Sequence, residues 1–384
     1  MDLLNAPMVL FDLMIFKVLP FLVILTIVVF FHELGHFLVA RWNSVKVDAF
    51  AVGFGPELFG FWDKHQTRWK FCAIPLGGYV KFRGDADASS KPDSVAVARM
   101  SADEREGAFP DAALWRKSLI VAAGPIANFI LALVIYTALF MSYGESYMSP
   151  VVGQIGKGSA AEAAGFEIGD KVISVEGNAV ESFSEISNYT YISSDRPLTF
   201  VVERDGREIA ITAAPKMTQR KDRFGNVFYT GLVGIGPKND PSLIVRRDLG
   251  PIDAFVKANG AVWQIISRTY YFIKELIVGK QDASELRGPL GIGHMTSQVA
   301  TLGIVELISL MAALSVSIGI MNLLPVPVLD GGHLLMYGIQ AVRGKELGPR
   351  AQDIAFRIGL TCVLMLMLFA TSNDIRRLFG FLGV

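Results

Sequence analysis

Four long apolar runs interrupt the chain, and each is long enough to cross a lipid bilayer as a helix. A spanning helix needs about 20 mostly apolar residues, because the hydrocarbon core of a bilayer is about 30 Å thick. The runs cover Val18–Ala40, Ser118–Met141, Gly303–Leu324 and Ile354–Ala370. This pattern predicts a multi-pass α-helical membrane protein with about four transmembrane helices.

The stretch between the first two runs predicts a small β structure. Residues Arg68–Phe82 alternate between apolar and polar side chains around Pro75 and the pair Gly77 and Gly78. Alternation of this kind, bounded by turn residues, is typical of a β-hairpin or of short strands. We expect a membrane-associated β-hairpin here, serving either as an exposed edge for a partner strand or as a purely structural anchor. The following residues, about Arg83–Phe109, are rich in Ala, Ser and Asp and predict a flexible loop.

A β-rich domain is predicted between the second and third runs. Within residues 151–215, short β-branched runs are separated by turn signals such as Glu176-Gly177. The stretch Ser159–Ala164, followed by Gly165, predicts a short helix with a capping residue at each end. The predicted strands are Lys171–Val175, Leu198–Glu203 and Glu208–Thr212.

An amphipathic helix is predicted over Asp253–Val278, where apolar residues recur at helical spacing opposite Lys and Arg side chains. Such a helix lies either along the membrane surface or against the β-rich domain, and the sequence leaves both alternatives open. The resulting segments are residues 1–42 (first transmembrane helix), 43–115 (cytoplasmic loop with the β-hairpin), 116–143 (second transmembrane helix), 150–240 (β-rich domain), 241–301 (amphipathic helix and linker), 302–336 (third transmembrane helix), 337–353 (cytoplasmic loop) and 354–384 (fourth transmembrane helix and tail).

Composition and charge agree with a membrane protein and exclude some kinds of partner. Hydrophobic residues make up 52% of the chain and charged residues 19%, against about a quarter charged in soluble domains. Lys+Arg and Asp+Glu both number 36, so no net positive field favours nucleic acid. The two cysteines, Cys72 and Cys362, lie far apart and offer neither a disulfide framework nor a paired-cysteine metal site.

The positive charges that flank the apolar runs predict the orientation of the chain in the membrane. Arg41 follows the first run, Arg116 and Lys117 precede the second, and four Lys or Arg residues fall between Arg343 and Arg357. Loops rich in Lys and Arg stay on the cytoplasmic side. Both termini and the β-rich domain are therefore expected outside the cytoplasm.

The chemistry suggested by the sequence centres on His32-Glu33-Leu34-Gly35-His36 in the first apolar run. Residues four apart share one face of a helix, so the two imidazoles can bind one metal ion while Glu33 stands beside it. Ionisable groups within a membrane span are costly and are retained mainly where they pair or serve a function. The alternative is a hydrated polar cluster near the membrane interface, since the motif lies toward the Arg41 end of the run.

A catalytic zinc site needs a third protein ligand and one open position. Asp330 is the best placed candidate, because it follows the third run on the same expected side of the membrane as the histidine pair. His333 is a rival ligand, and His65 and His294 are more distant candidates. The prolines that precede Asp330 break the helix there, and irregular backbone at membrane depth is tolerated only where protein or a watery cavity covers it.

Taken together, these motifs resemble the site-2 protease family of intramembrane zinc metalloproteases, in its bacterial branch that includes the sigma-E-regulating protease. The resemblance covers nearly the whole chain. It rests on residues 32–36, on Pro75-Leu-Gly-Gly-Tyr-Val-Lys81, on Gly124-Pro-Ile-Ala-Asn128 and on Asn322 to Gly332. Residues 153–165 and 168–177 resemble a PDZ domain, and one PDZ-like unit is present where the enterobacterial member is expected to carry two.

The resemblance implies an activity and a set of roles. It implies Zn²⁺ as cofactor, with His32, His36 and Asp330 as ligands and Glu33 as catalytic base. It implies that Asn322, Pro325 and Asn128 hold an unwound substrate segment, and the predicted hairpin with Gly77 and Gly78 is our candidate edge for capturing that segment. Ser317 departs from the family pattern, in which a second asparagine is common.

The implied substrates are single-pass transmembrane proteins, such as anti-sigma factors or remnant signal peptides, in the bacterial inner membrane. The PDZ-like domain would be periplasmic and would meet a peptide or a substrate ectodomain, while the active site would lie near the cytoplasmic side. Membrane lipid is an expected partner and nucleic acid is not. Two alternative functions are a zinc transporter, disfavoured because the sequence shows no internal repeat, and a PDZ scaffold with an inactive motif.

Overall fold

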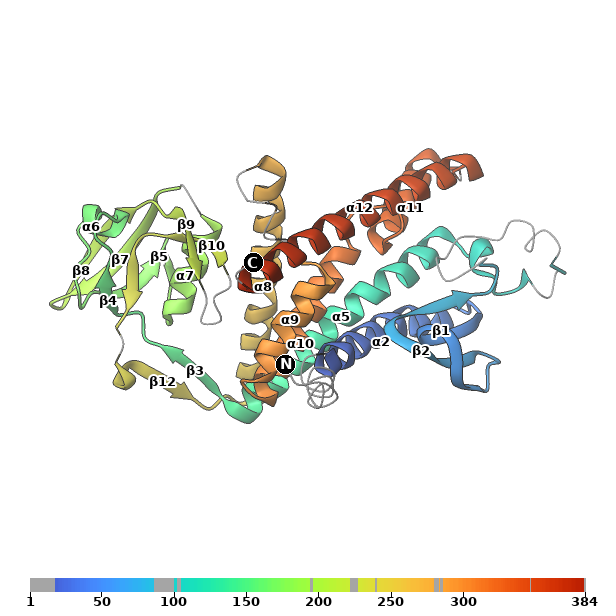
Figure 1. Ribbon diagram of the computed structural model, residues 1–384, viewed down its shortest axis with the longest axis horizontal. Coiled ribbons are helices and arrows are strands. Elements are labelled where there is room, and N and C mark those ends of the chain that lie inside the picture. The colour runs from blue at the N-terminus through green and yellow to red at the C-terminus, as the bar shows by residue number, and fades with distance from the viewer. Residues whose placement is uncertain are drawn as a thin grey trace. The chain divides into compact units, whose positions relative to one another are not determined.

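The computed structural model describes residues 18–85, 100–101, 105–193, 196–221, 227–238, 240–279, 283, 286–345 and 347–382 (Figure 1). The expected flexible loop at 83–109 falls largely outside these residues. The chain divides into two compact units, residues 1–135 with 286–384 and residues 136–285. Each unit is described by itself.

Among the described residues, four helices are long and apolar enough to span a membrane, as the hydrophobic pattern predicts. The fourth helix is much longer than the expected run Ile354–Ala370, because polar residues at both ends continue it beyond the apolar part. The helices are α2 (Leu19–Trp42), α5 (Leu114–Tyr143), α10 (Ile304–Asn322) and α12 (Pro349–Leu382). The fold class predicted from the sequence is confirmed in these helices.

Helices α2 and α5 approach closely through small residues. A Cβ added at Gly35 of α2 would overlap the carbonyl oxygen of Ala123 and lie 2.7 Å from the Ala127 Cβ. A Cβ at Gly124 of α5 would overlap the imidazole of His36. Small residues allow such close helix contacts in membranes, where dispersion rather than hydrophobic burial holds helices together. This contact brings α5 directly behind the two histidines of α2.

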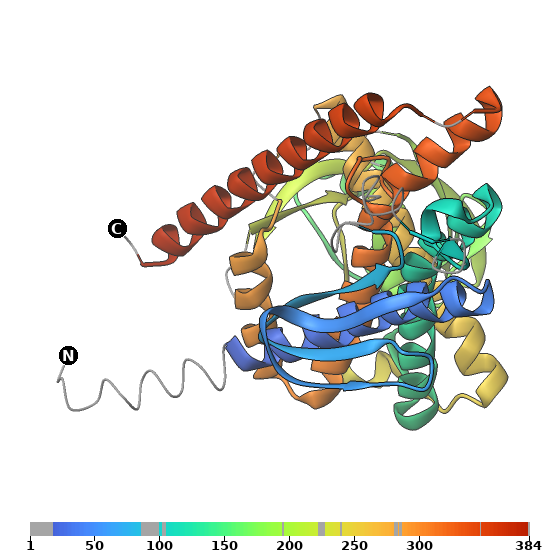
Figure 2. The ribbon, with the colours of Figure 1, turned by 90° about the vertical axis from the view of Figure 1, so that its right-hand side faces the viewer.

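The predicted hairpin exists, but it starts earlier in the chain than the pattern suggests. Strand β1 (Val47–Trp62) pairs antiparallel with β2 (Arg68–Phe82), and both lie beside α2 (Figure 2). Residues 68–82 form one irregular strand of this hairpin, and its residues 68–71 and 78–81 both pair with residues 49–52 of β1. Residues 78–82 pair with residues 47–52 and have no second strand neighbour among the described residues.

The β1–β2 turn is fixed to the end of α2 by a polar cluster. Burial raises the pKa of Asp63, but donors from Thr67, Trp69 and Arg41 stabilise its carboxylate more and bring the pKa to about 2. Arg41 forms an ion pair with Asp63, and its guanidinium lies 4.2 Å from the centre of the Phe37 ring. A charged carboxylate is thus paired over the whole physiological pH range, which fixes the hairpin against α2.

The segments around the third span are more helical than expected. The predicted linker contains helix α9 (Pro289–Ala300), which packs on α2, α10 and α12. The predicted loop 337–353 is also mostly helical, since α11 runs over Asp330–Arg343 and α12 begins at Pro349. Helices α9 and α12 each begin with a Pro, at a position where the missing N–H costs nothing, and the expectations undervalued this signal.

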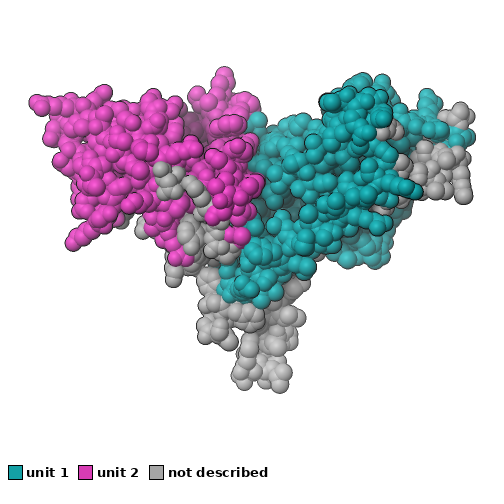
Figure 3. Space-filling view, turned by 90° about the horizontal axis from the view of Figure 1, so that it is seen from above, with its two compact units in different colours: residues 1–135, 286–384 teal, residues 136–285 magenta. Residues whose placement is uncertain are grey.

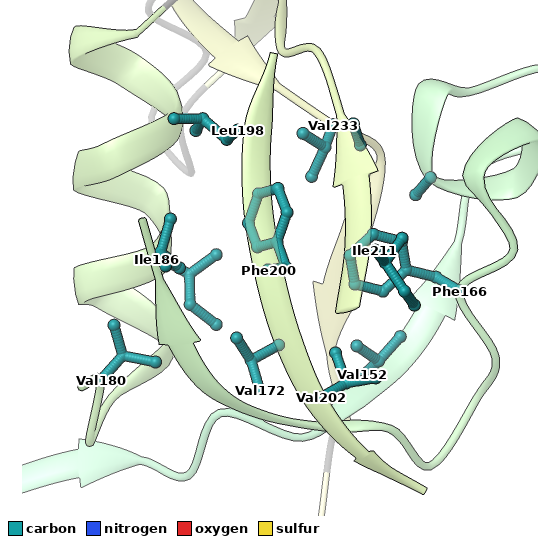
Figure 4. Close-up of a cluster of buried hydrophobic side chains, with 13 residues drawn as sticks. Val152, Phe166, Val172, Val180, Ile186, Leu198, Phe200, Val202, Ile211 and Val233 are labelled. Carbon is teal, nitrogen blue, oxygen red and sulfur yellow. The ribbon is translucent and has the colours of Figure 1, made fainter. Parts of the chain in front are cut away.

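The second unit, shown in magenta in Figure 3, contains the β-rich domain. Its main sheet has the order β6-β5-β7-β8, and the three strands predicted from the sequence are β5, β7 and β8. Alternate residues of β7 point into one core that also receives the helices α6 and α7 (Figure 4). The elements are α6 (Ala160–Ala164), β5 (Lys171–Val175), β6 (Asn178–Ala179), α7 (Phe183–Ile192), β7 (Leu198–Arg204) and β8 (Arg207–Ala213).

Shorter strand pairs complete this unit. The pairs are β4 (Val152–Ile155) with β11 (Ile235–Pro237), β9 (Lys216–Lys221) with β10 (Val227–Leu232), and β3 (Glu145–Met148) with β12 (Ile244–Arg247). The predicted caps of α6 are present: the Ser159 hydroxyl accepts the Glu162 N–H at 3.2 Å, and Gly165 has φ +86°. A left-handed residue at this point ends the helix, which favours glycine.

The predicted amphipathic helix is α8 (Pro251–Val278), and it packs on the β-rich domain. Lys257 forms an ion pair with Glu145 at 2.6 Å, and Arg268 donates to the Asn188 side chain at 2.7 Å. The opposite face of α8 carries exposed large apolar residues, namely Ile252, Val256, Trp263, Tyr270 and Ile277. One face of α8 therefore packs on the β-rich domain, which is one of the two predicted alternatives. The other face has no protein partner among the described residues.

Candidate metal centre and active site

Three side chains from two distant helices meet at one point in the first unit. His32 and His36 lie one helical turn apart on α2, and their Nε2 atoms are 3.2 Å apart. The Oδ2 atom of Asp330, the first residue of α11, lies 3.2 Å from the His32 Nε2 and 3.5 Å from the His36 Nε2. Both imidazoles are buried, with 7% and 8% of their residue surfaces exposed.

This arrangement fits a zinc ion. Ligand atoms at about 2.0–2.1 Å from a tetrahedral Zn²⁺ are about 3.3 Å from one another. The three observed separations, 3.2, 3.2 and 3.5 Å, match that spacing. Asp330 Oδ2 is buried and has no hydrogen-bond partner among the described residues, so the protein alone leaves this acceptor unsatisfied. Two nitrogens and one oxygen form a donor set typical of catalytic zinc, with a fourth position left open.

The other ring nitrogens of the two histidines are held by α5. His36 Nδ1 donates to the Ile120 carbonyl at 2.8 Å, which leaves the Nε2 lone pair for a metal. His32 Nδ1 lies 3.2 Å from the Asn128 side-chain amide. Asn128 is fully buried, and its Oδ1 has no hydrogen-bond partner among the described residues. Its backbone carbonyl accepts the Ser315 hydroxyl of α10 at 2.9 Å, so the residue is held from both sides.

Asp330 is positioned by a strained segment between α10 and α11. Val328 has φ +99°, a backbone conformation that costs a β-branched residue of order 1–3 kcal/mol. A Cβ added at Gly331 would overlap the carbonyl oxygens of Leu323 and Leu324, so only glycine allows α11 to begin this close to the broken span. The strain at Val328 and the close packing at Gly331 together aim the Asp330 carboxylate at the histidine pair.

Glu33 faces a cavity of about 180 Å³ next to the three donors. Its carboxylate accepts the backbone N–H of Val80, so strand β2 reaches the catalytic motif of α2. A Cβ added at Gly78 would lie 3.4 Å from the Glu33 Cγ, and the small residue therefore allows the strand to lie against the helix. The cavity is lined by His32, Glu33, His36, Val80, Phe82, Val121, Asn322, Val328, Leu329, Asp330 and His333.

The remaining predicted site residues lie at different distances from this cavity. Asn322 lines it, and Gly78 lies against Glu33. Gly77 faces Phe54 instead, and Pro325 is exposed outside the lining. Asn128 contacts His32 and does not line the cavity, so the expectation that it touches substrate is not supported by its position.

The rival metal ligands are not part of the donor group. Among the described residues, the group holds His32, His36 and Asp330 and excludes His65, His294 and His333. The exposed His65 belongs to the β1–β2 turn, where its backbone N–H donates to Asp63 at 2.8 Å. The His294 ring lies 3.0 Å from the Gln298 side chain on α9. Of the rivals, only His333 reaches the cavity.

Sequence reasoning missed three contributions to the site. The Ile120 carbonyl and the Val80 N–H are backbone groups, so the residue type at these positions does not reveal their contacts with the site. Gly124 carried a signal, since a glycine before a proline inside an apolar helix is costly and marks a close contact.

Comparisons with known proteins agree with this geometry. The model of peptidase family M50 matches residues 20–366. The chain belongs to peptidase family M50. This M50 peptidase is 45% identical to a "Putative zinc metalloprotease" of Rhizobium meliloti, over 97% of this chain and 99% of the relative. It is 37% identical to the metalloprotease MmpA of Caulobacter vibrioides, over 94% of this chain and 96% of that protein.

One solved structure resembles part of the chain. It is the PDZ domain of an SdrC-like protein from Listeria monocytogenes, 17% identical, covering 24% of this chain and 88% of that chain with a TM-score of 0.19. The family and the named relatives make this M50 peptidase a zinc metalloprotease, and the prediction of the site-2 protease family is confirmed. Its four apolar helices make it an integral membrane protein.

Proposed function

We propose that this M50 peptidase cleaves the transmembrane segments of single-pass membrane proteins within the bilayer. One observation carries the proposal: the metal donors His32 and His36 and the neighbouring Glu33 lie on an apolar helix long enough to span the membrane. A protease that acts on soluble peptides has no need to bury its site in such a helix.

The roles follow from the positions of the donors. His32, His36 and Asp330 hold Zn²⁺, and Asn128 orients the His32 ring. Zinc bound there supplies a Lewis acid that polarises the scissile carbonyl and lowers the pKa of water. Glu33, held by the Val80 N–H, takes the proton of the attacking water and passes it to the leaving amine.

A helical substrate must unwind before its peptide bond can react, because its amides are occupied within the helix. The edge of β2 at residues 78–82, which has a strand neighbour on one side only, is suited to pair with the unwound backbone. Gly78 lets this edge lie beside Glu33, and Gly77 shapes its approach. Asn322 and Pro325, at the broken end of α10, hold the other side of the substrate.

We assign the protein to the bacterial inner membrane, with the active site toward the cytoplasm and the PDZ-like domain in the periplasm. The charge pattern at the ends of the spans supports this orientation. The PDZ-like domain would meet either a substrate peptide or a bulky ectodomain, and the exposed apolar face of α8 would rest on lipid. Anti-sigma factors and remnant signal peptides are the expected classes of substrate.

Replacing Glu33 with Gln tests the proposal. The variant keeps the size of the side chain but loses the base, so cleavage of a single-pass model substrate in nanodiscs should fall by about 10²–10⁴-fold. Zinc content should stay at the parent level, since Glu33 is not among the donors. Undiminished cleavage by Glu33→Gln would refute the proposal, and cleavage confined to soluble peptides would refute its substrate class.

A further inference from the structure

The cavity beside the metal donors contains one histidine for which the proposed mechanism has no use. Its polar lining comprises the three donors, Glu33, Asn322 and His333. Four of these side chains bind metal or move a proton in the proposed reaction, and Asn322 is assigned to the substrate backbone. His333 is left without a role.

The backbone of α11 fixes the direction of the His333 side chain. His333 follows Asp330 by three residues in the first turn of α11, so both side chains leave the same face of the helix. A Cβ added at Gly332 would overlap the Val326 carbonyl oxygen, so the turn that bears His333 is packed directly on the segment before α11. A side chain on such a close-packed turn has little freedom to swing away from the cavity.

The imidazole of His333 is free to bind a ligand. Its ring lies 6.4 Å from the ring of Tyr337, and neither ring nitrogen makes a hydrogen bond among the described residues. Unpaired polar groups near the protein interior are uncommon and call for an explanation. A metal does not supply it, because His333 lies outside the group of donor atoms that fall within 4.8 Å of one another.

The chemistry of peptide hydrolysis gives a hydrogen-bond donor in this cavity a use in addition to the metal. When water adds to the carbonyl carbon, a C–O bond forms, the π electrons move to the carbonyl oxygen, and Glu33 receives a water proton. The oxygen then carries a developing negative charge until the C–N bond breaks and the amine leaves with that proton. A preorganised N–H aimed at this oxygen is worth about 10²–10³-fold in rate.

We propose that His333 is a further catalytic residue, whose ring N–H donates a hydrogen bond to the carbonyl oxygen of the scissile bond. The proposal rests on the function proposed above and deepens it. Neutral imidazole carries one N–H, so the residue acts as a donor without changing its charge. It stabilises the charge formed during reaction more than the uncharged carbonyl, and so acts on kcat more than on KM.

Three variants of the full-length protein test the proposal. His333→Leu removes the donor, His333→Gln replaces it with an amide N–H, and His65→Leu is the matched control at an exposed histidine outside the cavity. We expect His333→Leu to lower kcat by about 10²–10³-fold, His333→Gln to recover at least tenfold of that loss, and His65→Leu to match the parent. Zinc content should equal that of the parent in all three.

A second readout separates a catalytic from a structural role. A phosphinic peptide that mimics the tetrahedral geometry should bind His333→Leu about 10²–10³-fold more weakly. An uncleaved substrate segment, measured in the Glu33→Gln background, should bind with unchanged affinity. Zinc loss in both His333 variants would make the residue a ligand, and equal kcat in parent and His333→Leu would remove it from the reaction.

Either of those results would overturn the inference, as would equal losses in binding of the analogue and of the uncleaved segment. Failure of the proposed function is detected separately. It would appear as an inactive parent protein or as an active Glu33→Gln variant, before any His333 variant is considered.

Discussion

Two aspartates, one in each unit, show opposite ways of placing a carboxylate in this protein. Asp170 of the β-rich domain receives Arg204 Nε at 2.7 Å and Nη2 at 2.8 Å, and the Glu167 N–H at 2.9 Å. Asp330 of the first unit faces two imidazole nitrogens, and its Oδ2 has no hydrogen-bond partner among the described residues. Protein donors satisfy the first carboxylate, and the second is left for a cation that the chain does not itself supply.

The difference separates a carboxylate that stabilises the fold from a carboxylate that is available to bind a ligand. Burial raises the pKa of Asp170, but the Arg204 hydrogen bonds outweigh it and hold the pKa below its usual range, so the carboxylate stays charged and paired. Nothing is left for a ligand there. Around Asp330 the backbone is strained at Val328 and the neighbouring polar groups converge on one point. Strain and unsatisfied acceptors persist where function maintains them.

The largest expected effect comes from removing the unsatisfied carboxylate. Asp330→Ala takes away one of three protein ligands, so zinc affinity should fall by more than about 100-fold, beyond the loss typical of residues that only support a ligand. Cleavage should disappear with the metal. Competition with a fluorescent zinc chelator measures the affinity. Asp170→Ala is the matched control and should keep the zinc affinity of the parent. An equal loss of zinc in both variants would contradict the claim that Asp330 binds the metal and Asp170 does not.

A smaller effect is expected at Asn128. For His32 to bind metal through Nε2, its Nδ1 must carry the proton. The Asn128 amide nitrogen lies 3.2 Å from Nδ1, and turning this amide over brings Oδ1, which otherwise has no partner among the described residues, into place as the acceptor. Asn128→Leu removes the acceptor and should weaken zinc binding by about 10–100-fold, whereas Asn128→Asp keeps an oxygen and should lose less. Saturating zinc should restore cleavage in both. Persistent loss of cleavage at full zinc occupancy would return Asn128 to the substrate-binding role expected from the sequence.

The smallest effect is expected in the β-rich domain. Asp170→Asn weakens the hydrogen bonds to the partly exposed Arg204 and should cost about 1–2 kcal/mol of domain stability at pH 7. Because the folded pKa is lowered, this stability is present above the unfolded value of about 4 and is lost as the pH falls through the folded pKa. Limited proteolysis of the full-length protein in urea measures it. A difference between parent and variant that grows in acid would contradict the sign.

The sequence predicted the elements that depend on local pattern. Apolar length gave the four spans, and the spacing of His32 and His36 gave their shared face, since both depend only on helical geometry. Asp330 was found because two prolines and its expected side of the membrane narrowed the candidates. Turn and cap signals placed α6 and the strands of the β-rich domain.

Other features depend on contacts between residues far apart in the sequence, which the local pattern of residues does not reveal. Whether Asn128 meets substrate or His32 is decided by which face of α5 is buried, and the uniformly apolar helix gives no sign of it. Strand β1 was missed because its glycines weaken the β signal, although its Phe50 has two cross-strand partners, Val80 and Trp69. Only the structure separates His333 from the metal ligands, because the distances from Asp330 to His32 and His36 define a donor group without it.

X-ray absorption at the zinc edge, measured on the full-length protein and on Asp330→Ala, tests the central claim most directly. The account predicts one zinc per parent chain with two imidazole nitrogens at about 2.0–2.1 Å and light oxygen donors completing the shell. In Asp330→Ala the bound zinc should be lost or should keep the two imidazoles and lose one oxygen. An unchanged zinc shell at full occupancy in Asp330→Ala would contradict the account.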